Sequence, residues 1–182
     1  MEIYKTTLDE VNDLVFEILS EQKEAMVYCI ADENCAVIGT NGGADLQNIQ
    51  KLNLKTVEIK HEGGTIILSP GDVDIGIFTK GYEGHAYRDN LINLIIEKAA
   101  EKGYKAVVSG NDVLINGRKV IGFGSRYYGE ILYTAIHIAV YINLELIKTI
   151  CTKKMSKTPD ALSNYGIYTT DILDIMSVVF IQ

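Results

Sequence analysis

The chain has 182 residues, of which 47% are hydrophobic, and its formal net charge is −7. This length and hydrophobic content suit one folded domain with its own core and exclude a disordered chain. The acidic balance argues against a general nucleic-acid binder, and no apolar run approaches the roughly 20 residues that span a bilayer. The N-terminus lacks the pattern of a secretory signal. We therefore expect a single domain over residues 1–182, in the cytoplasm, with no nucleic-acid or membrane partner.

The N-terminal half predicts short helices and strands. Between Leu8 and Leu19 apolar residues recur every three or four positions, which places them on one face of a helix. Short apolar runs bounded by turn residues predict the strands. The expected elements are a helix over 8–23, strands over 25–31 and 35–39, a helix over 45–52, and strands over 56–60 and 71–78.

The C-terminal half predicts longer elements. Gly81 and Gly84 favour a loop, Gly103 ends the helix after it, and Asn143 is a suitable helix N-cap. The expected elements are a loop over 79–87, a helix over 88–102, a strand over 105–109, a hairpin over 113–123, a reversal at 126–130, a strand over 131–142, a helix from 143 and a helix over 169–180. This order predicts an α/β fold of the α+β type, with helices packed on a mixed, largely antiparallel sheet.

The hairpin over 113–123 is the first stretch with candidate chemistry. Asn116 and Gly117 both tolerate the positive φ of a type I′ turn, so the two strands are predicted to be antiparallel. Gly122 leaves room for a bulge, or for a group that lies close to the backbone. Lys119 follows the turn, and its ammonium suits a phosphate or a carbonyl oxygen that becomes negative. The alternative is an exposed hairpin lysine with no task.

A glycine pair in the segment 60–73 is the second candidate. Gly63 and Gly64 allow the backbone to approach a flat or extended ligand and to donate N–H groups to it. Glycine pairs are common in turns. This pair is more specific because it stands a fixed distance before Gly71-Asp72 and upstream of the hairpin.

These stretches resemble the superfamily of lipoate–protein ligases, octanoyltransferases and biotin–protein ligases. Asn111-Asp112 followed by Lys119 is similar to the lysine-bearing hairpin of that family. The segment Lys60-His61-Glu62-Gly63-Gly64 with Gly71-Asp72 is similar to the family's Arg-Arg-x-x-Gly-Gly and later Gly-(Asn/Asp/Gln) pattern. The resemblance implies a biotin/lipoate-ligase-like catalytic domain, and the length leaves no room for a C-terminal accessory domain.

The resemblance also implies the residues of the site. Lys119 would contact the acyl carbonyl and the phosphate of an acyl-adenylate, and Asp112 would lie beside a magnesium ion. The residues implied to bind ligand or nucleotide are Lys60, His61, Gly63, Gly64, Gly71, Asp72, Asn111, Asp112 and Gly122. Lys60 and His61 stand near the family's arginines, and neither side chain holds a phosphate bidentately. Nucleotide binding is therefore predicted to be weak or differently organised.

Three functions remain open. A lipoate–protein ligase would use ATP and magnesium to activate lipoate or octanoate, a small carboxylic acid, and transfer the acyl group to a lysine of a lipoyl-acceptor protein domain. An acyltransferase would work without ATP and carry the acyl group on Cys151, with Lys119, Lys153 or Lys154 lowering the pKa of its thiol. A non-catalytic relative would bind the ligand or serve as a subunit of a larger ligase.

Two further features are expected to be structural. His137 falls one or two positions from a histidine that the family carries, and a lone histidine in an apolar strand is usually a core residue. The basic cluster over 153–157 is expected to be solvated surface.

Overall fold

The computed structural model describes residues 1–39, 42–58, 64–152 and 155–180. The strands are β1 (Glu2–Thr6), β2 (Ala25–Ile30), β3 (Cys35–Ile38), β4 (Lys55–Glu58), β5 (Thr65–Leu68), β6 (Val73–Lys80), β7 (Ala106–Ser109), β8 (Asp112–Ile115), β9 (Arg118–Tyr128) and β10 (Ile131–Ile138). The helices are α1 (Val11–Ser20), α2 (Leu46–Lys51), α3 (Glu83–Glu101), α4 (Leu144–Ile150), the 3₁₀ helix η1 (Leu162–Tyr165) and α5 (Thr169–Phe180). Among the described helices, none has the length and apolar character needed to cross a membrane.

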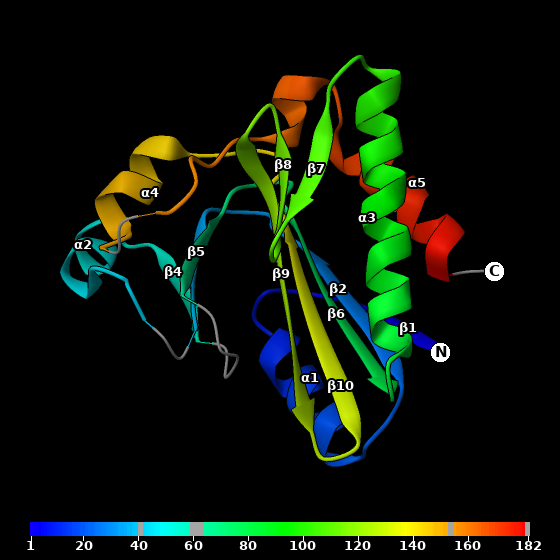
Figure 1. Ribbon diagram of the computed structural model, residues 1–182. Coiled ribbons are helices and arrows are strands. Elements are labelled where there is room, and N and C mark those ends of the chain that lie inside the picture. The colour runs from blue at the N-terminus through cyan, green and yellow to red at the C-terminus, as the bar shows by residue number, and fades with distance from the viewer. Residues whose placement is uncertain (40–41, 59–63, 153–154, 181–182) are drawn as a thin grey trace.

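The main sheet has seven strands in the order β1-β2-β6-β10-β9-β8-β7 (Figure 1). Only β1 and β2 run parallel, and every other neighbouring pair in this sheet is antiparallel. The predicted mixed, largely antiparallel sheet is confirmed. Its long central strands, β6, β9 and β10, provide the frame on which the site is built.

Helices cover the two faces of this sheet unequally. On one face α3 and α5 lie side by side and bury alternate residues of the central strands (Figure 1). The strand residues buried beneath these helices include Ile75, Ile77, Ile121, Ile136 and Ile138. On the other face α1 packs through Ile18 against Val27 and Phe78. It covers only part of that face, and the remainder faces a second sheet.

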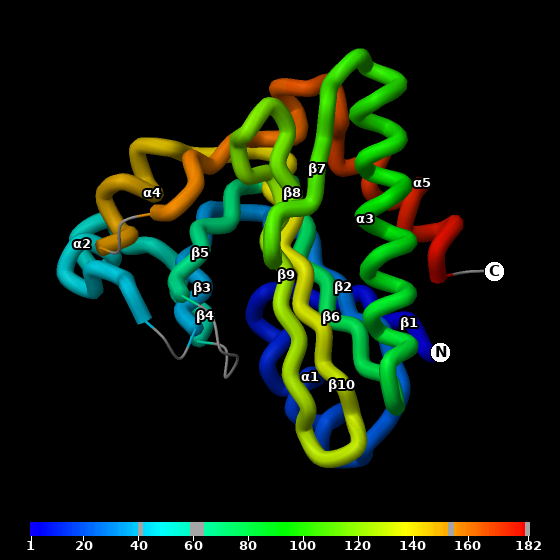
Figure 2. Tube along the Cα trace, viewed as in Figure 1, coloured from blue at the N-terminus to red at the C-terminus, as the bar shows by residue number. Residues whose placement is uncertain are grey.

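The second sheet has three strands in the order β4-β3-β5 and is flanked by α2 and α4 (Figure 2). Both flanking helices are N-capped by a side chain: Asp45 accepts from the N–H of Asn48, and Asn143 accepts from the N–H of Leu146. The Asn143 cap confirms the prediction made for that residue. Cavities remain between this smaller unit and the uncovered part of the main sheet.

The expected loop over 79–87 is wrong. β6 continues to Lys80 and α3 already begins at Glu83, so the helix starts five residues earlier than predicted. Gly84 lies in the first turn of this helix, where its N–H donates to Thr79 Oγ1 at 2.8 Å. A Cβ at this position would approach that oxygen to 2.7 Å, so the contact requires a glycine. A glycine favours a loop when the sequence alone is considered, but here it allows close packing at the start of a helix.

Other boundaries differ from the predicted ranges as well, and three of these differences concern long elements. The first helix begins at Val11 rather than at residue 8, and it ends at Ser20 rather than at residue 23 because Gln22 has positive φ. The reversal expected at 126–130 is narrower, since β9 runs on to Tyr128 and the chain turns at Gly129, with φ of 62°. The strand expected over 131–142 ends at Ile138.

Candidate active site

The hairpin that carries Lys119 contains a bulge. Asn116 and Gly117 have φ values of 51° and 78°, as the predicted type I′ turn requires. Leu114 pairs with Lys119 and Val113 with Ile121, so β9 has one extra residue, Val120, at this point. In a regular strand Lys119 and Gly122 would point to opposite faces. The extra residue brings both to the same face, so the bulge turns the lysine towards the glycine.

Lys119 occupies the space that a side chain at residue 122 would fill. A Cβ on Gly122 would lie 2.9 Å from Lys119 Nζ and 3.0 Å from its Cε. The close approach predicted for this glycine is therefore found, and the approaching group is the lysine three residues before it. Backbone bonds hold Lys119 on its other edge, because its N–H donates to Thr158 O at 2.9 Å and its carbonyl accepts from the N–H of Asp160 at 2.8 Å.

Two lysines share the carboxylate of Asp112. Lys119 Nζ lies 2.7 Å from Oδ1 and Lys157 Nζ lies 2.8 Å from Oδ2. Lys157 Nζ also donates to Ser109 O at 2.6 Å. Burial tends to raise the pKa of Asp112, but the hydrogen bonds and charges of the two lysines outweigh burial and hold that pKa below its usual value. The cluster carries two positive charges and one negative charge, which favours an anionic ligand.

A polar row crosses four neighbouring strands on this face of the sheet. Asp74 on β6 is paired with His137 on β10, His137 with Gly122 on β9, and Gly122 with Asp112 on β8. Residues directly opposite each other in antiparallel strands point to the same face. Since Lys119 Nζ fills the place at Gly122, the row reads aspartate, histidine, lysine, aspartate.

Two cavities of about 300 and 320 Å³ meet at this row. The first, which we call the lysine lobe, is lined by Lys157 and Cys151 together with the backbone of Gly42 and Gly43. Its described lining contains no Asp or Glu. The second, the aspartate lobe, lies along β9 and β10. The residues that distinguish it are Asp74, Asn111, Asp112, Phe123, Arg126 and Tyr133.

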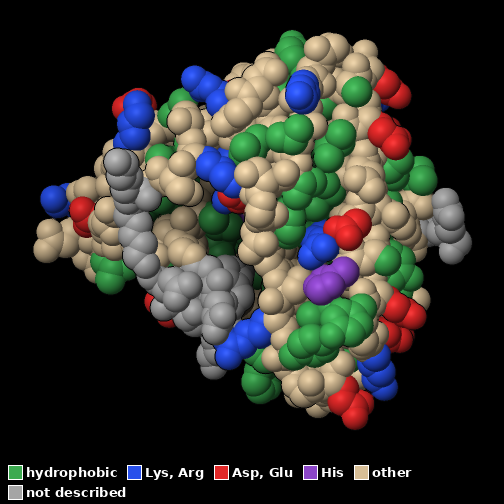
Figure 3. Space-filling view, viewed as in Figure 1, with side chains coloured by type: hydrophobic (Ala, Val, Ile, Leu, Met, Phe, Trp, Pro, Cys, Tyr) green, Lys and Arg blue, Asp and Glu red, His purple; other side chains and the backbone are tan. Residues whose placement is uncertain are grey.

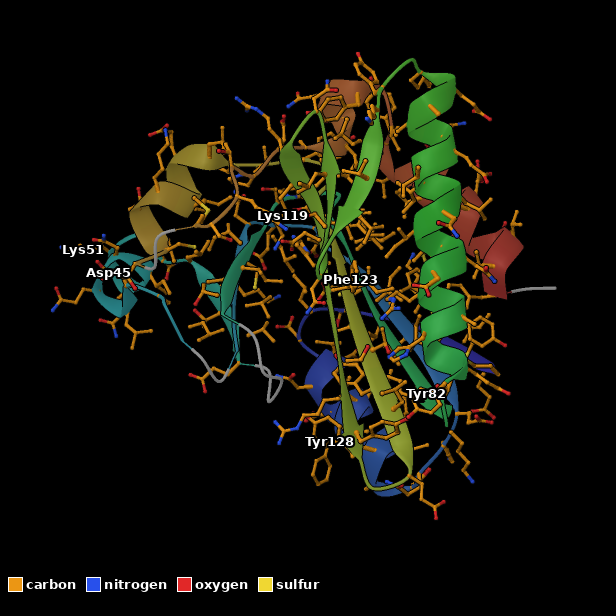
Figure 4. The ribbon with its side chains drawn as sticks, in the orientation of Figure 1. Asp45, Lys51, Tyr82, Lys119, Phe123 and Tyr128 are labelled. Carbon is orange, nitrogen blue, oxygen red and sulfur yellow. The ribbon has the colours of Figure 1, made fainter. Side chains whose placement is uncertain are left out.

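The residues common to both lobes are Gly64, Ile66, Lys119, Gly122 and His137. Lys119 and Gly64, from the two stretches singled out in the sequence, thus line the same space. Figure 3 shows basic and acidic side chains together at the edge of a hollow in the middle of the molecule. In Figure 4 Lys119 is labelled where the β8–β9 hairpin faces the smaller sheet.

Gly71 and Asp72, implied to bind ligand, have structural roles instead. Asp72 is 1% exposed, and its carboxylate accepts three backbone N–H groups at 2.8 Å each, from Ser69, Val140 and Tyr141. Burial raises the pKa of Asp72, while these hydrogen bonds act in the opposite direction. Gly71 has φ of 96°, and a Cβ there would overlap the ring of Tyr141. The pair joins the start of β6 to the residues that follow β10. Neither residue lines either lobe.

The remaining predicted site residues divide into two groups. Those that line one or both lobes are Gly64, Asn111, Asp112, Lys119, Gly122 and Cys151. Lys60, His61, Gly63, Lys153 and Lys154 lie outside the described residues.

Among the described residues, Cys151 does not have the environment expected of a nucleophile. Its side chain is half-buried at the end of α4, and its Sγ has only a weak contact, at 4.0 Å, with Thr65 O. Burial raises the pKa of the Cys151 thiol, the opposite of the predicted lowering. Lys119 cannot supply the expected positive charge freely because Asp112 already pairs with it.

The described residues do not fit a resident magnesium ion at Asp112. Each carboxylate oxygen accepts a hydrogen bond from a lysine ammonium group, and two positive charges within 2.8 Å of the carboxylate oppose a divalent cation there. Within the described ranges there is no group of three or more His, Cys, Asp or Glu side chains placed to hold a metal. The magnesium site predicted there is not supported.

Sequence reasoning missed three residues of the site. Lys157 belongs to the basic cluster expected to be solvated, yet its side chain is only 25% exposed and binds Asp112. His137 was expected to be a core residue, but it lines both lobes. Asp74 was not singled out. Asp74 and His137 are each a charged or titratable residue inside an apolar strand, and this feature of the sequence could have indicated that they belong to the site.

Comparison with known protein families identifies the family of this chain. The model of the lipoyl protein ligase A/B catalytic domain matches residues 7–175. The chain therefore belongs to the lipoyl protein ligase A/B catalytic-domain family. Among curated protein sequences, none matches it.

Solved structures agree with the fold at low sequence identity. LipL1 from P. falciparum, crystallised in complex with lipoate, has a TM-score of 0.75 and 14% identity, and the match covers 98% of this chain and 61% of LipL1. A bi-partite lipoate protein ligase from Thermoplasma acidophilum, studied with its E2 lipoyl domain, has a TM-score of 0.75, 12% identity, and coverage of 98% and 81%. Lipoate-protein ligase A bound with ATP has a TM-score of 0.74, 10% identity, and coverage of 98% and 83%. The chain thus spans about three fifths of LipL1.

Proposed function

We propose that this protein activates a carboxylic acid of the lipoate or octanoate class with ATP and transfers the acyl group to a lysine of an acceptor protein domain. The observation that carries the proposal is the position of Lys119 Nζ. It lies where the two lobes meet, in a space that Gly64 also lines, and 2.7 Å from Asp112. Solved relatives bind lipoate and ATP, and one was studied with its E2 lipoyl domain, which supports the same classes of ligand and partner here.

The two lobes together offer groups suited to both parts of an acyl-adenylate. The lysine lobe has Lys119 and Lys157 and no described carboxylate in its lining, so it suits phosphate oxygens. The aspartate lobe balances its acidic residues with Lys119 and Arg126 and presents the apolar surfaces of Phe123 and Tyr133. The lysine lobe is also lined by the aliphatic side chains of Ile67, Ile142 and Ile147, so an apolar acyl chain can lie against either lobe.

Lys119 then lies beside the atoms that react. In the first step the substrate carboxylate attacks the α-phosphate of ATP and pyrophosphate leaves. In the second step the acceptor amine attacks the acyl carbonyl, the carbonyl–oxygen bond to phosphate breaks, and AMP leaves. Both steps place negative charge near the junction of the lobes, where the ammonium of Lys119 stabilises it. No step is assigned to magnesium at Asp112, because the described residues do not fit it.

A ligase subunit is the second candidate function. One structural relative is a bi-partite ligase, and this chain matches 81% of the chain compared. A protein of this kind would bind lipoate and ATP but would require a second polypeptide for one of the two steps.

The decisive experiment follows the mass of an acceptor lipoyl domain incubated with the protein, lipoate and ATP. We expect an ATP-dependent gain of one lipoyl group that Lys119→Met lowers by about 10²-fold or more, as loss of a transition-state donor does. Lys51→Met is the matched control, because Lys51 lies at the exposed end of α2, away from both lobes (Figure 4).

The other results separate the alternatives. A gain from an acyl-carrier substrate without ATP, abolished by Cys151→Ser, would establish the acyltransferase. No gain under either condition, with lipoate binding retained, would favour the subunit or a non-catalytic relative.

A further inference from the structure

His137 has two charged neighbours in the polar row. On β6 its partner is Asp74, and on β9 its partner is Gly122, whose place is filled by Lys119 Nζ. Directly opposed residues have Cβ atoms about 4.5–5.5 Å apart, so the imidazole lies between a carboxylate and an ammonium. Its side chain is 16% exposed and lines both lobes at their junction.

The two ring nitrogens of His137 have different surroundings. Nδ1 is buried without a hydrogen-bond partner among the described residues, and the nearest acidic oxygen is Asp74 Oδ1 at 3.4 Å. A proton on Nδ1 is stabilised by that carboxylate, and the other nitrogen, Nε2, is then an acceptor. Since Nδ1 is inaccessible, the exposed part of the ring, which faces the lobes, is the part that can meet a ligand.

We propose that His137 is a catalytic residue of the transfer step and that Asp74 is a positioning residue that orients its ring. This inference rests on the proposed function. The acceptor amine forms the N–C bond to the acyl carbonyl, the bond to the phosphate oxygen breaks with its electron pair, and AMP leaves. The proton lost by the amine passes to Nε2 of His137 and then to solvent.

The other groups at the junction are less suited to accept that proton. Lys119 and Lys157 present ammonium groups, which are donors only, and both oxygens of Asp112 already accept from them. Arg126, in the aspartate lobe, is likewise a donor only. Among the described residues that line the lobes, Asp74 is the other carboxylate besides Asp112, and it lies on the far side of the imidazole from Lys119 in the row.

The test measures the two half-reactions separately. Amide formation is followed from a preformed acyl-adenylate and an acceptor domain across a range of pH, and adenylate formation is followed by pyrophosphate release. We expect His137→Gln to slow amide formation by about 10²-fold or more and to remove the acid limb of its pH profile. Adenylate formation is expected to change by less than about threefold, because the base acts only in the second step. Asp74→Asn is expected to slow amide formation while keeping the acid limb.

His85→Gln is the matched control, since His85 lies in the first turn of α3, outside both lobes. If wild-type protein performs both steps and His137→Gln transfers at the same rate, the role of His137 is refuted and the proposed function stands. An equal loss in both half-reactions, or the same defect in thermal unfolding for His137→Gln and Asp74→Asn with an unchanged pH profile, also refutes it. A wild-type protein that performs neither step overturns the proposed function together with this inference.

Discussion

Replacement of Gly122 by alanine tests whether the place of Lys119 depends on the missing side chain. The added Cβ would lie 2.9 Å from Nζ and 3.0 Å from Cε of Lys119, whereas non-bonded heavy atoms prefer about 3.5–4.0 Å. Nζ must therefore retreat by roughly 0.6 Å or more. The retreat disturbs its 2.7 Å bond to Asp112 and removes the ammonium from the row.

The expected effect is on activity far more than on folding. A hydrogen bond to a charged group contributes about 1.5–3 kcal/mol, which corresponds to roughly a tenfold to 150-fold loss of adenylate formation. Lys119 is 38% exposed and ends in a flexible chain, so the free energy of unfolding should fall by less than about 1 kcal/mol. Initial rates of pyrophosphate release and urea denaturation measure the two quantities.

A double-variant cycle separates this mechanism from a general disturbance of β9. If Gly122→Ala acts through Lys119, the variant that also carries Lys119→Met should be no less active than Lys119→Met alone. Additive losses would refute the reasoning, and so would an active Gly122→Ala protein.

Three other predictions concern Asp72, Asp112 and Cys151. Asp72→Ala should lower the free energy of unfolding by about 3 kcal/mol or more in urea denaturation, because three backbone N–H groups lose a buried acceptor; a change below about 1 kcal/mol would contradict the structural role. Asp112→Asn should lower the free energy of unfolding at pH 7 but not at acidic pH. A carboxyl whose pKa is lowered in the folded state contributes stability above its unfolded pKa, near 4, and that contribution is lost as the pH falls through the folded pKa. An equal loss of unfolding free energy at pH 7 and pH 3 would argue against the two-lysine arrangement. Cys151 should react with a thiol-specific reagent at pH 8 more slowly than free cysteine, because burial raises the pKa of its thiol, and Cys151→Ser should retain transfer; rapid modification would revive the acyltransferase.

Local chemistry determines much of the fold. Asn116-Gly117 defined its hairpin turn because both residues reach positive φ at low cost, and Asn143 defined a helix start because its side chain caps a free N–H. The final helix was predicted at its observed bounds, Thr169–Phe180, from apolar spacing alone. Each of these signals depends on residues close together in the chain.

The site depends on contacts between residues far apart in the sequence, which local sequence patterns do not predict. Lys157 reaches Asp112 across 45 residues, and the row from Asp74 to Asp112 exists only through the register of four strands. The bulge at Val120 decides which face Lys119 occupies, since a one-residue change in a strand reverses every later side chain. Asp72 illustrates the converse: its motif matched a binding segment, yet burial and three backbone donors assigned it to the framework. The sequence alone therefore indicated the family's architecture and its lysine, while strand register and packing decided which charges meet.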